Sequence, residues 1–405
     1  MNLQIGPILS TLKRHRITCT LLVLQIALTC AIVCNAVFLV RDRLGWMDTP
    51  SGVLEDRLVR IEVGDIGSRS DMHARTESDL RALRALPGVR AATVMNSLPF
   101  GDRSWNSGIS LARNQRESSV KTGNFYGEGV GETLGLSLIA GRWFRPDEYA
   151  WIDDVVSART PAAPVVIVSQ ATADRLFPDG HALGRSVFMG EDEARIVGIV
   201  ARLSRAGNDD RATIGLSTLQ PLREFPAMGA GFVLRVKAGE AERVLVAAAA
   251  TLRKLDPRRV ITDKQTYREI RDAFFAGDRA MAVLLVGVCV ALLIVTALGI
   301  VGLASFWVGQ RRRQIGVRRA LGARRVDVLR YFQIENFLLA SIGIAIGMVM
   351  AYAINLLLMW QYEVPRLPAA YLPAGAIVLW LLGQAAVLAP ALRAAAVPPV
   401  VATRG

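Results

Sequence analysis

Residues 311–330 read RRRQIGVRRALGARRVDVLR, and they begin two residues after an uncharged apolar run, 281–308. A bilayer-spanning helix needs about 20 consecutive apolar residues with few charges, so the run before the arginines predicts a membrane span. Eight of the twenty residues in the quoted stretch are arginine. Such charge directly beside a span is typical of a cytoplasmic loop, of a surface that binds anionic lipid, or of a nucleic-acid surface.

Three further stretches have the composition of membrane spans: 17–40, 337–360 and 372–392. The whole chain of 405 residues is 52% hydrophobic and 20% charged, which is too apolar for an ordinary soluble protein and too charged for one that lies wholly in the membrane. The first run is longer than the apolar core of a signal peptide, about 7–15 residues, so we expect an uncleaved anchor. The pattern predicts an integral membrane α-helical protein with four transmembrane helices.

The charge distribution predicts which segments face the cytoplasm. The formal net charge is +13, yet residues 44–275 carry 31 basic and 30 acidic side chains, so the excess lies in the short segments around the spans. Short cytoplasmic loops carry the surplus of Lys and Arg, whereas long domains are exempt from that rule. With four spans, all the basic segments fall on one side. The predicted order is a cytoplasmic N-terminus, an outer domain, a cytoplasmic loop, an outer loop and a cytoplasmic tail, at residues 1–16, 44–275, 311–335, 361–371 and 393–405.

The arginine stretch has no aromatic side chain before Tyr331 with which to stack bases, and it matches no recognisable DNA- or RNA-binding module. We therefore set nucleic acid aside as a partner and expect contact with lipid headgroups, since arginines at this depth meet anionic lipids. The residues expected at the membrane surface are Arg311, Arg312, Arg313, Arg318, Arg319, Arg324 and Arg325.

No catalytic or metal-binding pattern is present in the sequence. The three histidines, His15, His73 and His181, are scattered, and none lies in an HExxH or comparable metal spacing. Neither a GxSxG elbow nor a GxxxxGK[ST] phosphate-binding loop occurs. We therefore expect no enzyme activity, no catalytic residue, and no cofactor or metal bound by this chain.

The segment 44–275 has mixed helix and strand signals, which predict a large α+β domain. Two β-α-β units, separated by a long insertion, suggest a split ferredoxin-like layer. We read the insertion, about 125–215, as a second, β-rich subdomain that includes a hairpin at 183–200. The predicted strands are 57–63, 89–95, 231–236 and 258–263, and the predicted helices are 77–86 and 241–255.

Small residues recur at four-residue spacing in the third span, at Gly343, Gly347 and Ala351. This spacing marks a face on which a neighbouring helix can approach closely. The spans contain no ionisable residue that would suggest an ion pathway. Their uncharged polar residues therefore predict hydrogen bonds between helices rather than a transport route, and these are Gln25, Asn35, Thr296, Asn355 and Gln384.

The segment RRRQIGVRRALGARRVDVLRYFQIENFLLASIGIAIG (311–347) resembles the signature of the FtsX-like/MacB-like permease domain of ABC transporters. Its matching parts are a basic cluster, Ile315-Gly316, the Ala-Leu-Gly-Ala at 320–323, Glu335, and a Gly-containing span. The outer segments LGLSLIAGRWF, VVIVSQATADRLFP and ARIVGIV are similar to the MacB-type periplasmic core domain. The likeness covers most of the chain in the same order.

The resemblance implies a stand-alone permease subunit in a bacterial inner membrane, coupled to a separate cytoplasmic ABC ATPase that would bind ATP and Mg. It also implies a second permease chain, identical or different, and is compatible with a periplasmic adaptor protein. By this likeness, 311–335 is the coupling element that carries ATP-driven motion to the periplasmic domain, a scheme called mechanotransmission. The residues expected to serve this coupling are Ile315, Gly316, Ala320, Leu321, Gly322, Ala323 and Leu329.

Two related functions stay open beside export or efflux: release of lipoproteins, and an FtsX-like transducer that activates a periplasmic hydrolase and transports nothing. The MacB-like outer segments favour export, since FtsX outer domains are shorter and lack them. The sequence does not indicate the substrate.

Overall fold

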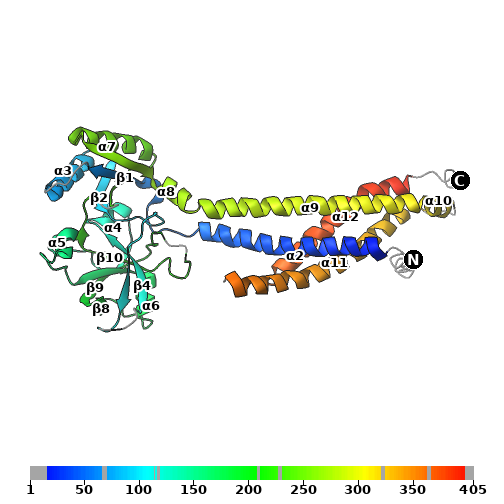
Figure 1. The fold of residues 1–405 in the computed structure, drawn as a ribbon, viewed down its shortest axis with the longest axis horizontal. Helices are drawn as coiled ribbons and strands as arrows, with labels where there is room; N and C mark the ends of the chain where they lie inside the picture. The colour runs from blue at the N-terminus through cyan, green and yellow to red at the C-terminus, as the bar shows by residue number, and fades with distance from the viewer. Residues whose placement is uncertain are drawn as a thin grey trace. The chain divides into compact units, whose positions relative to one another are not determined.

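The computed structural model describes residues 16–65, 71–113, 115, 119–207, 210–226, 230–320, 324–362 and 366–396. The chain divides into two compact units. The helical unit comprises Met1–Met47 and Asp278–Gly405, and the α+β unit comprises Asp48–Gly277 (Figure 1).

The helical unit contains four helices long and apolar enough to cross a membrane, as predicted from the uncharged runs. Each helix extends beyond the uncharged run by several residues, because charged and polar residues at the ends continue the same hydrogen-bonded backbone. The helices of this unit are α2 (Arg16–Met47), α9 (Ala276–Gln310), α10 (Arg312–Ala320), α11 (Arg325–Tyr362) and α12 (Tyr371–Ala395).

Helix α11 joins two segments that the sequence pattern presents as separate. It begins at Arg325, inside the predicted coupling element 311–335, and continues without a break through the predicted third span. Its 38 residues correspond to a rod of about 57 Å at 1.5 Å per residue. The second half of the coupling element is therefore the first part of a membrane helix.

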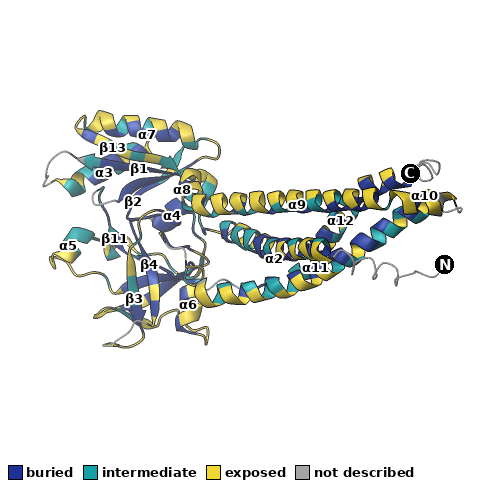
Figure 2. Ribbon diagram, turned by 45° about the vertical axis from the view of Figure 1, so that its right-hand side comes forward, coloured by how far each residue is buried: buried dark blue, intermediate teal, exposed yellow. Residues whose placement is uncertain are grey.

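Helices α2, α11 and α12 form the packed centre of the helical unit, and their core includes Ile26, Ile344 and Leu379. Helix α9 is more exposed than α2. In the most apolar stretch of α9, 17% of the residues are buried, against 56% in that of α2. Figure 2 shows α9 exposed along most of its length. An apolar helix with an open face needs lipid or another protein to cover it.

The α+β unit contains a four-stranded antiparallel sheet of order β13-β1-β12-β2, formed by two β-α-β units as predicted. Alternate residues of the strands, such as Ile61, Val94 and Phe232, form one core with both helices, because side chains on one face of a strand recur every second residue. The elements are β1 (Leu58–Asp65), α3 (Met72–Arg84), β2 (Val89–Met95), β12 (Gly231–Val236), α7 (Ala241–Leu255) and β13 (Arg259–Thr266).

Inserted between β2 and β12 is a seven-stranded sheet of order β5-β9-β7-β10-β4-β3-β8. Strand β8 also pairs with β9, so the sheet closes into a ring whose interior is filled by side chains such as Ile109, Val187 and Ile196. Closure leaves few unpaired strand edges. The strands are β3 (Asn106–Ser110), β4 (Val120–Tyr126), β5 (Leu138–Gly141), β7 (Val165–Ser169), β8 (Ser186–Met189), β9 (Asp192–Val200) and β10 (Ser217–Gln220).

The expected limits of this insertion, about 125–215, are too narrow. Strands β3 and β4 belong to its sheet and begin at Asn106 and Val120. Their sequences NSGIS and VKTGNFY are polar and contain glycine, which hides them from a search for apolar strand patterns. The hairpin expected at 183–200 is confirmed by β8 and β9, which turn at Gly190.

Short elements complete the α+β unit. The pair β6–β11 is parallel and lies at the side of the insertion, with β6 directly before helix α5 in the chain. Helix α8 precedes α9 and begins with a capping box, in which Thr266 and Glu269 satisfy each other's backbone amides. These elements are η1 (Glu55–Arg57), α4 (Val130–Leu134), η2 (Pro146–Glu148), β6 (Ala150–Trp151), α5 (Ile152–Val156), α6 (Gln170–Leu176), β11 (Leu222–Arg223) and α8 (Tyr267–Phe274).

Candidate functional site

A buried ion pair in the helical unit joins the residue after α9 to α11, within the predicted coupling element. Arg311 Nη1 donates to Glu335 Oε2 at 2.9 Å, and Arg311 Nη2 donates to Glu335 Oε1 at 3.2 Å. The Glu335 side chain is 1% exposed and that of Arg311 is 13% exposed. Two parallel bonds of this kind fix orientation as well as distance. We call Arg311, Glu335 and their neighbours Trp307 and Tyr331 the helical joint.

The neighbours hold the guanidinium of Arg311 from two further sides. Its carbon lies 5.7 Å from the centre of the Trp307 ring, and its Nη1 lies 3.5 Å from the Tyr331 hydroxyl oxygen. The charge is therefore satisfied inside the bundle rather than by water. Because Arg311 follows α9 and Glu335 belongs to α11, the helical joint ties the ends of the α9–α11 connection together.

Arg311 consequently has a different environment from the lipid surface that the sequence pattern predicts for it. The chain places it at the end of α9, where it turns to Glu335 in the core. Four other members of that set have exposed positions: Arg312, Arg313, Arg324 and Arg325. The backbones of Arg318 and Arg319 belong to α10.

Of the residues expected to serve the coupling, some lie in the core and others at the surface. Ile315 is 6% exposed and packs in the core of the bundle, with Leu329 against it. Gly316 is also buried, and Ala320 is exposed. Leu321, Gly322 and Ala323 lie outside the described residues. Among the described residues of this element, the large apolar side chains that are exposed are Val317 and Val326, at 46% and 52%.

The small-residue face of α11 lies against α2. A side chain on Gly343 would meet Ile26 Cβ at 2.9 Å, and one on Gly347 would meet Cys30 Cβ at 2.5 Å and the Ala27 carbonyl oxygen at 2.6 Å. Ala351 is fully buried and its carbonyl oxygen accepts a hydrogen bond from Asn35 Nδ2 at 3.0 Å. The absence of larger side chains is what lets the two backbones approach.

Four of the five uncharged polar residues of the spans form hydrogen bonds between helices, as predicted, whereas Asn355 bonds the segment before α12. Gln25 Nε2 donates to the Val295 carbonyl oxygen at 3.1 Å, and the Thr29 and Thr296 hydroxyls lie 2.8 Å apart, so both pairs connect α2 with α9. Asn355 Oδ1 accepts from the amide of Leu367, and Gln384 Nε2 donates to the Gln333 carbonyl oxygen.

In the α+β unit, Arg271 of α8 lies just before the chain leaves the unit and bonds the segment by which the chain enters it. Its Nη1 donates to Glu55 Oε1 at 2.7 Å and its Nη2 to the Thr49 carbonyl oxygen at 2.8 Å. The guanidinium carbon lies 5.0 Å from the Phe100 ring centre and 5.3 Å from that of Phe275. We call these five residues the domain joint. It binds the segment after α2 to the segment before α9.

A buried carboxyl lies at the return from the insertion to the four-stranded sheet. Glu224 follows β11 and is 8% exposed. Burial is the main cause that raises the pKa of Glu224 to about 7, against the opposing effect of a hydrogen bond from the Phe225 backbone. The sequence pattern gives no reason to single out this residue.

Sequence reasoning also misses the pairing of Arg311 with Glu335. One signal was available: Glu335 is a lone acidic residue in the run FQIENFLL, directly before an uncharged span. A carboxylate in such surroundings needs a cationic partner, and a neighbouring stretch of eight arginines supplies one. The sequence alone does not show which arginine it is.

Two family models match the chain and together cover most of it. The MacB-like periplasmic core domain matches residues 24–252, which is more than half of the chain. The FtsX-like permease C-terminal region matches residues 286–399. The first match contains the α+β unit up to α7, and the second contains the helical joint.

Among curated relatives, the macrolide export ATP-binding/permease protein MacB of Chromobacterium violaceum is 31% identical over 225 residues, which are 55% of this chain and 33% of that protein. The Escherichia coli protein of the same name is 28% identical over 242 residues, 58% of this chain and 35% of that protein. The chain thus spans about a third of the length of these relatives. The crystal structure of the periplasmic region of MacB from Actinobacillus actinomycetemcomitans covers 56% of this chain and 97% of its own, with 14% identity and a TM-score of 0.33.

Proposed function

The chain belongs to the MacB-like family with an FtsX-like permease region, and on that premise we propose that it transmits ATP-driven motion across a membrane as the permease of an ABC-type export system. It is a membrane protein with an extracytoplasmic domain, the α+β unit. The ATPase is one that these 405 residues do not contain, because no phosphate-binding loop occurs in them.

The observation that carries the proposal is that one continuous helix, α11, contains both the second half of the predicted coupling element and a membrane span. A force applied near Arg325 acts on a helix that is continuous to Tyr362. The Arg311–Glu335 pair holds this helix to the end of α9, and α9 leads back to the α+β unit. Because helices are stiff along their axis, movement at one end reaches the other without a water-filled path through the bundle.

The proposed orientation follows from charge. The exposed arginines of α10 and the start of α11 face the cytoplasm and rest at the lipid headgroups, and both termini lie on the same side. In this orientation Val317 and Val326 are the exposed apolar side chains available to an ATPase. Leu321, Gly322 and Ala323 lie between these two valines in the sequence.

A second permease chain is the partner that fits the open side of the bundle. The exposed apolar side chains of α9 include Val283, Leu284 and Leu298, at 68%, 64% and 64% exposure. Lipid covers whatever a second chain leaves open. A periplasmic adaptor is the further partner proposed for the extracytoplasmic domain, since the relatives named above are export proteins. We propose export rather than lipoprotein release or signalling on the extent of the core-domain match.

The test is affinity purification of the full chain from mild detergent, followed by mass spectrometry and an ATPase assay in proteoliposomes. We expect a P-loop ATPase to copurify. Replacing Leu321 by Ala or Gly322 by Val should leave the chain in the membrane while ATP hydrolysis no longer drives movement of the extracytoplasmic domain, followed by a fluorescent probe on that domain. Val349→Ala is the matched control, because Val349 is 72% exposed on α11 away from the coupling element.

Unchanged coupling in the Leu321 and Gly322 variants would contradict the role of residues 311–335. Copurification of a cell-wall hydrolase without cargo movement would instead favour the FtsX-like transducer. Transfer of lipoproteins in a reconstituted assay would favour lipoprotein release.

A further inference from the structure

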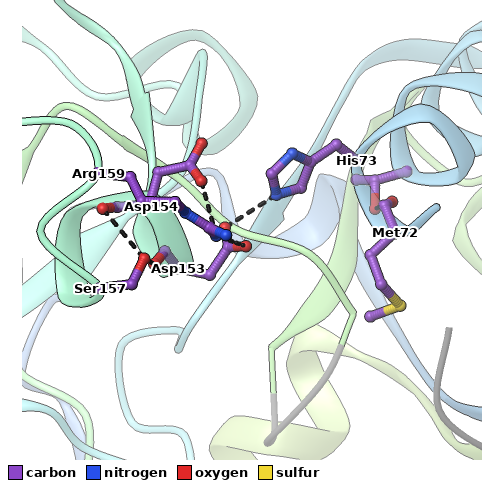
Figure 3. A network of polar contacts seen from close by, with 7 residues as sticks. Met72, His73, Asp153, Asp154, Ser157 and Arg159 are labelled. Carbon is purple, nitrogen blue, oxygen red and sulfur yellow. Dashed lines mark hydrogen bonds and ion pairs between the residues drawn. The ribbon is translucent and has the colours of Figure 1, made fainter. Parts of the chain in front are cut away.

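Three side chains with metal-binding chemistry meet in the α+β unit, outside the regions that the proposed function uses. In the part of the chain that the structure describes, His73, Asp153 and Asp154 form a group whose ligand atoms lie within 4.8 Å of one another. His73 Nε2 is 2.8 Å from Asp153 Oδ1. Figure 3 shows His73 reaching from α3 toward the two aspartates of α5.

The surroundings orient the imidazole. The His73 ring stacks on Trp151 with a centre-to-centre distance of 4.0 Å and an angle of 3° between the planes. Trp151 belongs to β6, which is held by its pairing with β11 and leads directly into α5. The stacking therefore fixes the histidine relative to the helix that carries the aspartates. A preset orientation of this kind lowers the cost of assembling a site.

One imidazole nitrogen and two carboxylates are ligands that zinc accepts, at distances of about 2.0–2.2 Å. Two such ligands in a tetrahedron lie about 3.4 Å apart, so the present spacing needs shifts of only about an ångström. We propose that His73, Asp153 and Asp154 form a binding site for a zinc-like divalent cation, with the fourth position left to water. All three side chains are partly accessible, so the cation can enter from solvent.

Arg159 already pairs with both carboxylates of the group. Its Nη2 lies 3.2 Å from Asp153 Oδ2 and 2.8 Å from Asp154 Oδ1. The Arg159 side chain is 61% exposed, so it can turn into water without leaving a buried charge. The cation and the guanidinium therefore compete for the same carboxylates, and removing the guanidinium should strengthen binding.

The site connects the two parts of the α+β unit. Helix α3 packs on the four-stranded sheet through Leu83, whereas α5 follows a strand of the insertion. A bound cation would add bonds of fixed length across this contact. It would therefore hold the insertion to the sheet more firmly than the His73–Asp153 hydrogen bond does alone.

The test uses the full chain in detergent, without a histidine tag and stripped with EDTA. Zinc binding is measured by competition with a chromophoric chelator, and the thermal midpoint is recorded with and without zinc. We expect one zinc per chain and a higher midpoint. His73→Ala and Asp153→Asn should weaken binding about tenfold or more, whereas Arg159→Gln should tighten it.

His181→Ala is the matched control, because His181 is exposed and bonded to the Asp179 backbone. Three results would overturn the proposal: no zinc binding by the wild type, equal binding by wild type and His73→Ala, or weaker binding by Arg159→Gln. The Arg159→Gln variant distinguishes two roles of Arg159: tighter zinc binding means that Arg159 competes with the cation, and weaker binding means that it supports the local fold.

Discussion

The arginines of the two joints, Arg311 and Arg271, have different surroundings. Arg311 in the helical joint meets one carboxylate, Glu335, that is nearly inaccessible. Arg271 in the domain joint divides its bonds between a backbone carbonyl and Glu55, whose side chain is 35% exposed, and lies near two aromatic rings. The helical joint centres on one desolvated ion pair, flanked by Trp307 and Tyr331. The domain joint has a more exposed carboxylate and shares the bonds of its arginine with a backbone carbonyl.

The difference teaches where a single substitution is felt. A buried charge that loses its partner cannot be compensated by water, so its loss is costly. A charge with several partners, some of them open to solvent, keeps part of its stabilisation when one is removed. We therefore expect the helical joint to be fragile and the domain joint to be tolerant.

The largest expected effect breaks the helical joint. Glu335→Ala leaves Arg311 buried without its carboxylate and should lower the free energy of unfolding by about 3–5 kcal/mol. The measurement is thermal unfolding in detergent, followed by circular dichroism. Replacing both Arg311 and Glu335 by Met should restore most of the loss, because an apolar pair needs no desolvation. The control is Asp56→Ala, because the ion pair of Asp56 with Arg268 is 76% exposed on both sides. If Glu335→Ala lowers the free energy of unfolding no more than Asp56→Ala does, the helical joint is not the more fragile of the two joints.

The next largest effect is expected at Glu224, a buried carboxyl of the α+β unit for which the contacts described above include no basic partner. Burial raises the pKa of Glu224 to about 7 in the folded chain, against 4.5 for the carboxyl of an unfolded chain. As the pH rises from 4.5 to 7, the unfolded chain releases this proton first, so the folded state loses stability across that window. Glu224→Gln should be more stable than the wild type by up to about 3 kcal/mol at pH 8 and no different near pH 4.

Unfolding curves at pH 4, 6 and 8 measure this gap between wild type and variant. Glu193→Gln, at an exposed position of β9, should show no gap at any of these pH values. A Glu224→Gln advantage that is the same at all pH values would mean that the charge of Glu224 is not its cause.

A third substitution probes the tolerance of the domain joint. Arg271→Ala removes the bonds to Glu55 and Thr49 and should cost about 2 kcal/mol, which is less than Glu335→Ala. Arg271→Lys should recover part of this, since an ammonium keeps the charge but not the planar fork. The comparison is made by thermal unfolding against Arg268→Ala, an exposed arginine of the same helix, expected within about 0.5 kcal/mol of the wild type. If Arg271→Ala costs more than Glu335→Ala, the ranking of the two joints is reversed.

The smallest expected effect is at the close contact between α11 and α2, which involves no ion pair. Gly347→Ala puts a methyl group against Cys30 and the Ala27 carbonyl, and overpacking of this kind should cost about 1–2 kcal/mol. Gly302→Ala has nothing within 4 Å of the new methyl group and gains the same helix propensity. Thermal unfolding should therefore rank Gly302→Ala above the wild type and Gly347→Ala below it.

The sequence predicts the membrane helices and the four-stranded sheet well, for physical reasons. Uncharged runs such as 337–360 have one stable outcome in a bilayer, and the apolar alternation of GFVLRV fits a strand covered on one face. The polar strands β3 and β4 escape prediction because their stability comes from neighbours that close the ring, not from their own composition.

The site residues are less predictable, because their roles depend on which side chains meet. Arg311 and its neighbours in sequence are chemically equivalent, yet the turn after α9 brings Arg311 alone to Glu335 within the described residues. His73 and Asp153 are 80 positions apart, so no spacing rule connects them. The tight face of Gly343 and Gly347 is different, since four-residue spacing on one helix is itself the signal.

Glu335 divides α11 into a short arm and a long arm. Ten residues of α11, about 15 Å, precede Glu335, and 27 residues, about 40 Å, follow it. If the pair acts as a fulcrum, the helix is a lever with unequal arms. A displacement of about 2 Å at the arginine end then becomes a swing of about 5 Å at Tyr362, in the opposite direction. Deleting one turn of α11 beyond Glu335 would reduce the displacement at Tyr362 and leave the Arg311–Glu335 pair unchanged.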